Sequence, residues 1–210
     1  SIKSEKNHSK LSFIKNSVMI DIAFQNTLQP QKGRILISDP FAGDDFFERS
    51  VVYLCEHSDE GSFGFVLNNL VDLNLRELNE AFPSIDISLS TGGPVETESL
   101  FFLHALGDQM NLSSKIADGI FIGGDFQQLY KTITPEHIEN NQVRFFIGYS
   151  GWSAGQLEDE IKQNSWVVAE VKNSEEIMQI HQPDTWKYFM EKLGSKYKLM
   201  TDFPINPNDN

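Results

Sequence analysis

The chain has 210 residues, 40% of them hydrophobic, which is enough for one globular domain with a substantial core. No apolar run approaches the ~18 residues of a membrane-spanning helix. The polar opening residues do not resemble a secretory signal, so we expect a cytoplasmic protein without a membrane partner. A single cysteine excludes an internal disulfide and a zinc site built from cysteines.

The net charge of −13 is unevenly distributed along the chain. Residues 1–19 and 185–201 each carry four lysines against one glutamate, so the rest of the chain is strongly acidic. An acidic body repels phosphate backbones, and only the two lysine-rich ends could attract them. The charge pattern therefore disfavours direct nucleic-acid binding. We expect an unidentified protein or small-molecule partner, with DNA binding through the lysine-rich ends as the alternative.

Three segments are predicted along the chain. Residues 1–27 form an N-terminal extension, partly helical because apolar residues recur there at helical spacing. Residues 28–200 form a single domain, and residues 201–210 a flexible C-terminal tail.

The predicted elements of the domain combine hairpins with helices. Apolar and β-branched runs predict strands over residues 34–38, 50–56, 62–67, 87–90, 100–106, 119–122, 143–149 and 166–171. Amphipathic spacing predicts helices over residues 73–82, 125–133, 174–180 and 184–193. Early strands come in hairpins and later strands alternate with helices. This order predicts an α+β fold: a mixed, mostly antiparallel sheet surrounded by helices.

The stretch GYSGWSAGQLEDE, residues 148–160, follows the 143–149 strand and begins another helix. With Ser153 as the N-cap, Gln156 completes a capping box, and Trp152 and Leu157 take the two positions of a hydrophobic staple. The three carboxylates after Leu157 then lie near the positive end of the helix dipole. Asn164 fits a left-handed helix stop before the next strand.

The glycines of this stretch have three possible explanations. Gly148, Gly151 and Gly155 could turn a structural corner, cradle a phosphate, or make room for a neutral ligand or protein partner that contacts Trp152. A phosphate cradle needs free N–H groups and usually a cation, but the stretch holds three carboxylates and no basic residue. We therefore favour the structural corner.

Ordered blocks of residues resemble the YqgE/AlgH family of bacterial proteins. They are FERSVV (47–52), EH (56–57), Gly61 and Gly64, LN (67–68), GGPV (92–95), LH (103–104), and GYSGW with GQLE and Glu160. The resemblance runs from about residue 33 to 193. It implies a compact α+β domain with a barrel-like sheet surrounded by helices, no established enzymatic activity and no cofactor. One family member's name is tied to control of exopolysaccharide synthesis, and a transcriptional-regulator label is attached to the family on that basis. Cys55 does not belong to the family pattern.

The candidate nucleophiles and bases have plainer structural explanations. Cys55 and His57 would face the same way on a regular strand, but no third group is evident, so we favour a buried cysteine and a histidine that orders the turn. His104 is flanked by apolar residues, which favours a satisfied histidine inside the sheet. His137 is expected to be exposed near a helix start. No histidine pair has metal-ligand spacing, so neither a metal nor a cofactor is expected.

We expect a non-enzymatic binding or regulatory protein without catalytic residues. The candidate ligand or partner surface comprises His57, Asn68, Gly92, Gly93, Gly151 and Trp152, on the hypothesis that these residues converge. The alternative is a small hydrolase or transferase with its site at the strand-end glycine turns near His57.

Overall fold

A computed structural model describes residues 24, 26–40, 46–85, 87–134, 141–179 and 184–202. The helix expected within the N-terminal extension, His137 with its expected exposure, and residues 203–210 of the expected tail lie outside these ranges. Residues 201 and 202, also assigned to the tail, close the last helix.

One sheet organises the fold, and its strands are β1 (Ile35–Ser38), β2 (Val51–Ser58), β3 (Gly61–Val66), β4 (Leu89–Thr91), β5 (Val95–His104), β6 (Ser114–Ala117), β7 (Ile120–Ile122), β8 (Val143–Ser153) and β9 (Trp166–Ala169). Their order is β6-β7-β5-β8-β3-β2-β1-β9, and β4 pairs with β8 beside this path. The β4–β8 pair is parallel and the other pairs are antiparallel. The α+β prediction is confirmed. The described sheet is open, with β6 and β9 at its ends, so it does not close as the barrel-like expectation implied.

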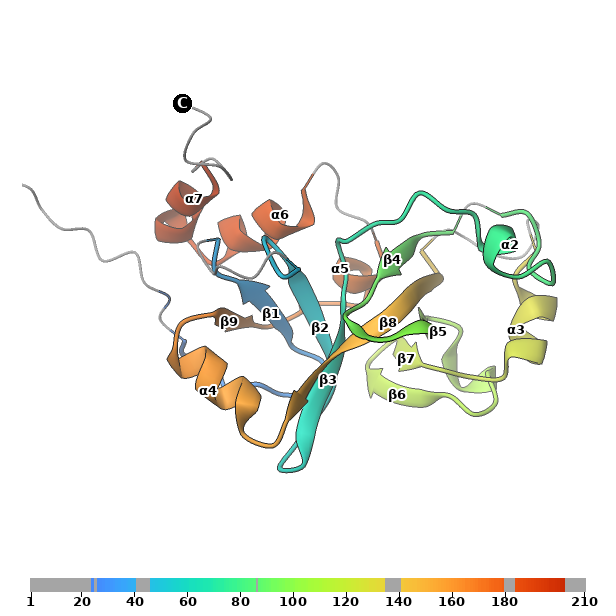
Figure 1. Cartoon of the computed structure of the whole chain (residues 1–210), viewed down its shortest axis with the longest axis horizontal. Helices are drawn as coiled ribbons and strands as arrows, with labels where there is room; N and C mark the ends of the chain where they lie inside the picture. The colour runs from blue at the N-terminus through green and yellow to red at the C-terminus, as the bar shows by residue number, and fades with distance from the viewer. Residues whose placement is uncertain are drawn as a thin grey trace, which may run out of the picture.

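The helices are α2 (Leu75–Leu78), α3 (Phe126–Thr132), α4 (Gln156–Lys162), α5 (Glu175–Met178), α6 (Thr185–Lys192) and α7 (Ser195–Thr201). A short 3-10 turn, η2, spans Gly107–Gln109. In Figure 1, α6 and α7 lie above β1 and β2, α4 lies beside β9, and α2 and α3 cover the far end of the sheet.

Both faces of the central strands are buried. In β1, Ile35 and Ile37 belong to a core cluster that includes Trp186 of α6, while Leu36 belongs to a second cluster under α4. Burial on both faces accounts for the continuous apolar run of this strand. A third cluster, under α2 and α3, surrounds Phe145 at the other end of the sheet.

Strand β8 connects the two ends of the sheet (Figure 1). Its first half pairs with β5 on one edge and β4 on the other. Its second half, Ser150–Ser153, pairs with Gly61–Gly64 of β3. The 143–149 prediction was therefore too short, because pairing with β3 extends the strand to Ser153.

Candidate functional site

The Gly92–Gly93 turn is a point where the chain crosses directly over β8. A Cβ atom built on Gly93 would lie 2.0 Å from the carbonyl carbon of Tyr149, and one on Gly92 would lie 2.4 Å from the Gly148 oxygen. No side chain fits at such backbone-to-backbone contact. Gly148 itself adopts φ +66°, where a Cβ would lie 2.6 Å from the Gly93 oxygen. These three glycines are therefore explained by the crossing.

The polar groups of the crossing bond within the protein. The Gly92 N–H donates to the Ile147 carbonyl at 2.8 Å. The Gly92 carbonyl accepts from the Val66 N–H at 2.9 Å and from the Ser150 hydroxyl at 3.0 Å. Because the Gly92 donor and acceptor are occupied, this turn does not present them to an anion. For Gly148, the geometry agrees with the structural-corner interpretation.

The helix after β8 begins later than predicted. Gly155, at φ +76°, is the N-cap of α4, and Ser153 remains in the strand, so the prediction of Ser153 as the N-cap was wrong. One part of the expected capping box is present, since the Gln156 side chain accepts from the Ser153 N–H at 3.0 Å. Trp152 and Leu157 are buried in the same cluster. Asn164 has φ +64°, as expected of a left-handed stop.

Glu160 serves as a hydrogen-bond acceptor for two tryptophans. Its Oε2 accepts from the indole N–H of Trp152 and from that of Trp166, each at 2.8 Å. Its Oε1 accepts from the Gln156 amide at 2.9 Å. Both indoles are buried, and the carboxylate fixes their orientation. The sequence interpretation had assigned this carboxylate only to the helix dipole.

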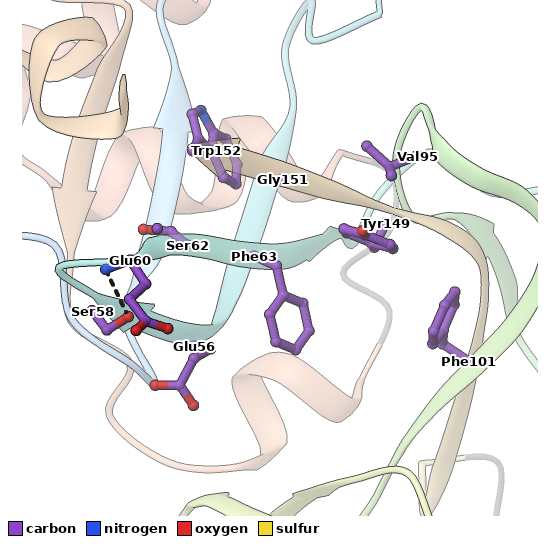
Figure 2. Close-up of a pocket in the computed structure, with 11 residues that line it drawn as sticks. Glu56, Ser58, Glu60, Ser62, Phe63, Val95, Phe101, Tyr149, Gly151 and Trp152 are labelled. Carbon is purple, nitrogen blue, oxygen red and sulfur yellow. Dashed lines mark hydrogen bonds between the residues drawn. The ribbon is translucent and has the colours of Figure 1, made fainter. Parts of the chain in front are cut away.

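A hollow of ≈ 640 Å³ lies where β2, β3, β5 and β8 meet (Figure 2). Its apolar lining comprises Phe63, Val95, Phe101, Tyr149 and Trp152. The Phe63 and Tyr149 rings lie edge to face with centroids 5.9 Å apart, and those of Phe101 and Tyr149 are 5.7 Å apart. Gly151 lies opposite Phe63 in the β3–β8 register, and the Tyr149 ring packs against it, since a Cβ built there would lie 3.1 Å from a ring carbon. The volume is within the usual range of small-ligand pockets.

Carboxylates border this aromatic pocket. Glu56 and Glu60 line it, and both are exposed. Glu56 also has Lys32 at 3.7 Å, in an ion pair that is open to solvent on both sides. The pocket thus combines aromatic rings with negative charge at its border.

Two of the six predicted site residues, Gly151 and Trp152, line the pocket. Gly92 and Gly93 form the crossing beside it. Asn68 bridges loops, because its Oδ1 accepts from the Val51 N–H at 2.9 Å and its amide donates to the Arg49 carbonyl at 2.8 Å.

The sixth predicted residue, His57, lies on the opposite face of the β2–β3 hairpin from the pocket rings. Its Nδ1 is 2.7 Å from the Ser62 hydroxyl, and its Nε2 is 3.6 Å from Glu158 of α4. His57 and Ser62 are directly opposed in the register, and Phe63 follows on the other face because side chains alternate along a strand. The structure therefore brings Gly151 and Trp152 to the pocket, whereas His57 faces away from the rings and Asn68 bonds at the other end of the β2–β3 hairpin.

A β-bulge separates Cys55 from His57. The β2–β3 register shifts between Leu54 and Glu56, so Cys55 lies in the main core while His57 faces α4. Burial raises the pKa of the Cys55 thiol well above its usual value, which leaves it a poor nucleophile. The two side chains therefore do not face the same way as they would on a regular strand, and the expectation of a buried cysteine is confirmed.

His104 is fully buried within the sheet. Its Nδ1 accepts from the Leu106 N–H at 3.3 Å, and its ring stacks on Phe121 with centroids 5.4 Å apart. Burial lowers the pKa of His104, opposed in part by the Gly123 carbonyl. The burial matches the sequence interpretation, but the Nε2 of His104 makes no hydrogen bond of normal geometry to the described residues, so the histidine is not fully satisfied as expected.

Sequence reasoning missed Phe63, Phe101 and Tyr149, the aromatic part of the pocket. They come from three strands whose pairing the sequence does not specify. Among the described residues, no cluster of three His, Cys, Asp or Glu side chains could hold a metal ion. Within the same part of the chain, no helix is long and apolar enough to cross a bilayer.

The fold and the pocket define an α+β protein with an open, mostly antiparallel sheet and an aromatic, acid-bordered hollow at the second half of β8. A family model described as AlgH-like matches residues 35–198, and the chain belongs to this family.

Relatives support the assignment. A UPF0301 protein of Cytophaga hutchinsonii is 42% identical over 181 residues, which cover 85% of this chain and 98% of that protein. One from Bacteroides thetaiotaomicron is 40% identical over 186 residues, covering 88% and 94%.

Solved structures show the same fold. The solution structure of the AlgH protein from Pseudomonas aeruginosa has a TM-score of 0.66 at 26% identity, covering 86% of this chain and 98% of that one. A crystal structure of a Corynebacterium diphtheriae protein has a TM-score of 0.68 at 22% identity, covering 86% and 95%, and it supports the fold alone.

Proposed function

We propose that the protein is a non-enzymatic binding protein whose site is the aromatic pocket, and that the pocket takes a positively charged group on an apolar stem. A regulatory role, exerted in the cytoplasm through such binding, is part of the proposal. We also propose that residues 28–200 act as one domain, which the span of the family match supports.

One observation carries the proposal: three partly exposed rings lie beside two exposed carboxylates. The faces of Phe63, Phe101 and Tyr149 attract a cation, and the carboxylates add Coulomb attraction. Lysine and arginine side chains have this combination of an apolar stem and a charged head. An anion would meet Glu56 and Glu60 at the border, so phosphate compounds fit poorly.

A titration with a matched pair of ligands tests this function. The probes are N-acetyl-arginine amide and N-acetyl-citrulline amide, which have nearly the same shape and differ in charge. We expect the arginine compound to bind with a Kd of about 1 mM, as a single side chain without other contacts would, and the citrulline compound at least about tenfold more weakly. Chemical shifts of the Gly151 amide and the Trp152 indole report the binding.

Variants locate the site. Glu56→Gln and Glu60→Gln should each weaken binding of the arginine compound, whereas Glu191→Gln, on the exposed face of α6, should leave it unchanged. If neither compound shifts these signals, or if both bind equally, the pocket does not select a cation and the proposal fails.

A second candidate function rests on the contact between Ser62 and His57. The 2.7 Å separation, with Glu158 at 3.6 Å on the far nitrogen, resembles a nucleophile, a base and an orienting acid. In that reaction His57 takes the hydroxyl proton, Ser62 Oγ forms an acyl bond as the leaving group departs, and water then releases the acid. The near-complete burial of Ser62 weighs against it. Labelling of the wild type by a fluorophosphonate, lost in Ser62→Ala, would support a nucleophilic Ser62. A wild type that is not labelled would refute this second candidate function.

A further inference from the structure

We propose that the partner is an extended segment of another protein, which adds a strand to the open edge of β8 at Gly151–Ser153 and inserts an arginine or lysine side chain into the aromatic pocket. This inference rests on the proposed cation-binding function and names the class of ligand.

The second half of β8 has one free edge. In the sheet order, β5 and β3 lie on opposite edges of β8. Pairing with β5 ends at Val95–Tyr149, whereas pairing with β3 continues to Ser153. Within the described ranges, residues Gly151–Ser153 therefore have a strand partner on the β3 edge alone. Gly151 and Ser153 are exposed, as an open edge requires.

The backbone groups of Gly151 point toward this free edge. The Ser153 N–H donates to the Gln156 side chain at 3.0 Å, so it does not bond to Gly61 of β3, its register partner. Residues of an antiparallel pair alternate between exchanging both hydrogen bonds and exchanging none. Gly151 lies two residues before Ser153, so it likewise exchanges no backbone hydrogen bonds with its partner in β3, Phe63. Its N–H and C=O thus face away from β3 and can pair with an added strand.

The register of an added strand places one side chain over the pocket. A residue that exchanges both hydrogen bonds with Gly151 has its side chain on the same face of the sheet as Gly151. That face is the one that carries Phe63, the partner of Gly151 in β3. Because Gly151 has no side chain, the Tyr149 ring lies directly over its backbone, and the opposing residue of the partner meets this ring and that of Phe63. Val95 and Tyr149, where the β5 pairing ends, form the adjacent wall.

Charge complementarity specifies a basic partner. Besides Glu56 and Glu60 at the pocket, β5 presents exposed Glu96 directly after Val95, where the strand bulges away from β8. Glu56 has Lys32 at 3.7 Å, so the three carboxylates leave a net negative charge at this edge, which repels an acidic segment and attracts a basic one. Main-chain pairing then supplies affinity while the pocket selects the side chain, as in other cases of strand addition.

The experiment compares three probes on the full chain. They are N-acetyl-arginine amide, the peptide acetyl-Thr-Val-Arg-Val-Thr-amide, and the same peptide methylated on the backbone amide nitrogen of its arginine. We expect the peptide to bind at least about tenfold more tightly than the single residue, and methylation to remove this gain because the methylated nitrogen has no proton to donate to the Gly151 carbonyl. Hydrogen exchange of the Gly151 amide should slow with the peptide and remain unchanged with the single residue.

Each outcome has a definite meaning. If the single residue binds and the peptide gains nothing, or if methylation has no effect, strand addition is wrong while the cation site stands. If neither binds, the proposed function fails together with it. If the peptide binds tightly only after residues 1–19 are removed, that lysine-rich segment of the chain itself is the occupant, and the inference of a separate partner is overturned. Gly151→Val, which fills the pocket from a backbone position without positive φ, should abolish peptide binding in a folded protein.

Discussion

Glu160 should be the most important carboxylate for the stability of the second half of β8. Replacing it with alanine leaves the buried indole N–H groups of Trp152 and Trp166 without their acceptor. An unsatisfied buried donor costs about 1–3 kcal/mol, so two of them predict a loss of about 3 kcal/mol after partial relaxation. Glu160→Gln keeps an acceptor oxygen and loses only the charge, so we expect a loss of about 1 kcal/mol.

Urea unfolding followed by far-ultraviolet circular dichroism measures this loss without relying on the tryptophan fluorescence that the substitution itself changes. With a slope of about 2–3 kcal/mol per M, the Glu160→Ala midpoint should fall by about 1–1.5 M. Asp159→Ala is the matched control on the same helix, because the Asp159 carboxylate forms an ion pair with exposed Lys162, and its midpoint should stay close to that of the wild type. A Glu160→Ala midpoint equal to that of the control would show that the indoles have other acceptors and would refute the reasoning.

Two further predictions concern the crossing and the buried histidine. Gly93→Ala should lower the free energy of unfolding by more than about 3 kcal/mol or prevent folding. Gly155→Ala should lower it by about 1–2 kcal/mol, because Gly155 has φ +76° but no atom lies within 4 Å of a built Cβ. Equal thermal stabilities of the two variants would contradict the close crossing. Because burial lowers the pKa of His104, the unfolded chain binds this proton at higher pH than the folded one. The stability that neutral His104 contributes is therefore present above the ordinary value of 6.5 and is lost as pH falls from there toward the folded pKa. Between pH 7.5 and 5, the urea midpoint should fall more steeply for the wild type than for His104→Gln. Parallel curves would show that His104 is not the source of the pH dependence.

Local sequence signals were sufficient for most elements. The β2–β3 hairpin and the Asp125 cap of α3 follow from turn chemistry and apolar runs, and both are present. The Ser114–Ala117 strand was missed because its only buried residue is Ile116, so no run or alternation marks it. Helix α2 is much shorter than the predicted 73–82 segment, since its capping box begins at Asn74 and the chain leaves helical geometry at Asn79.

The site was harder to predict than the fold, because it depends on contacts between distant segments. Trp152 and Gly151 were identified from the glycine-rich stretch itself. The rings of Phe63 and Phe101 reach the same hollow only because β3 and β5 both flank β8, and nothing in either segment specifies that pairing. The N-cap moved from Ser153 to Gly155 for a similar reason: a tertiary strand pairing overrode a local helix signal.

The position of β1 in the sheet has a consequence for biosynthesis. Strand β1 lies between β2 and β9, and all four residues of β1 pair with Trp166–Ala169. As the chain emerges from the ribosome, β1 can join β2 early, but its other edge stays uncovered until the last strand of the sheet has been made. Exposed apolar strand edges are where nascent chains associate wrongly. A chain truncated before residue 166 should therefore aggregate or recruit chaperones. Once β9 has been synthesised and pairs with β1, the nascent protein should no longer self-associate through this edge.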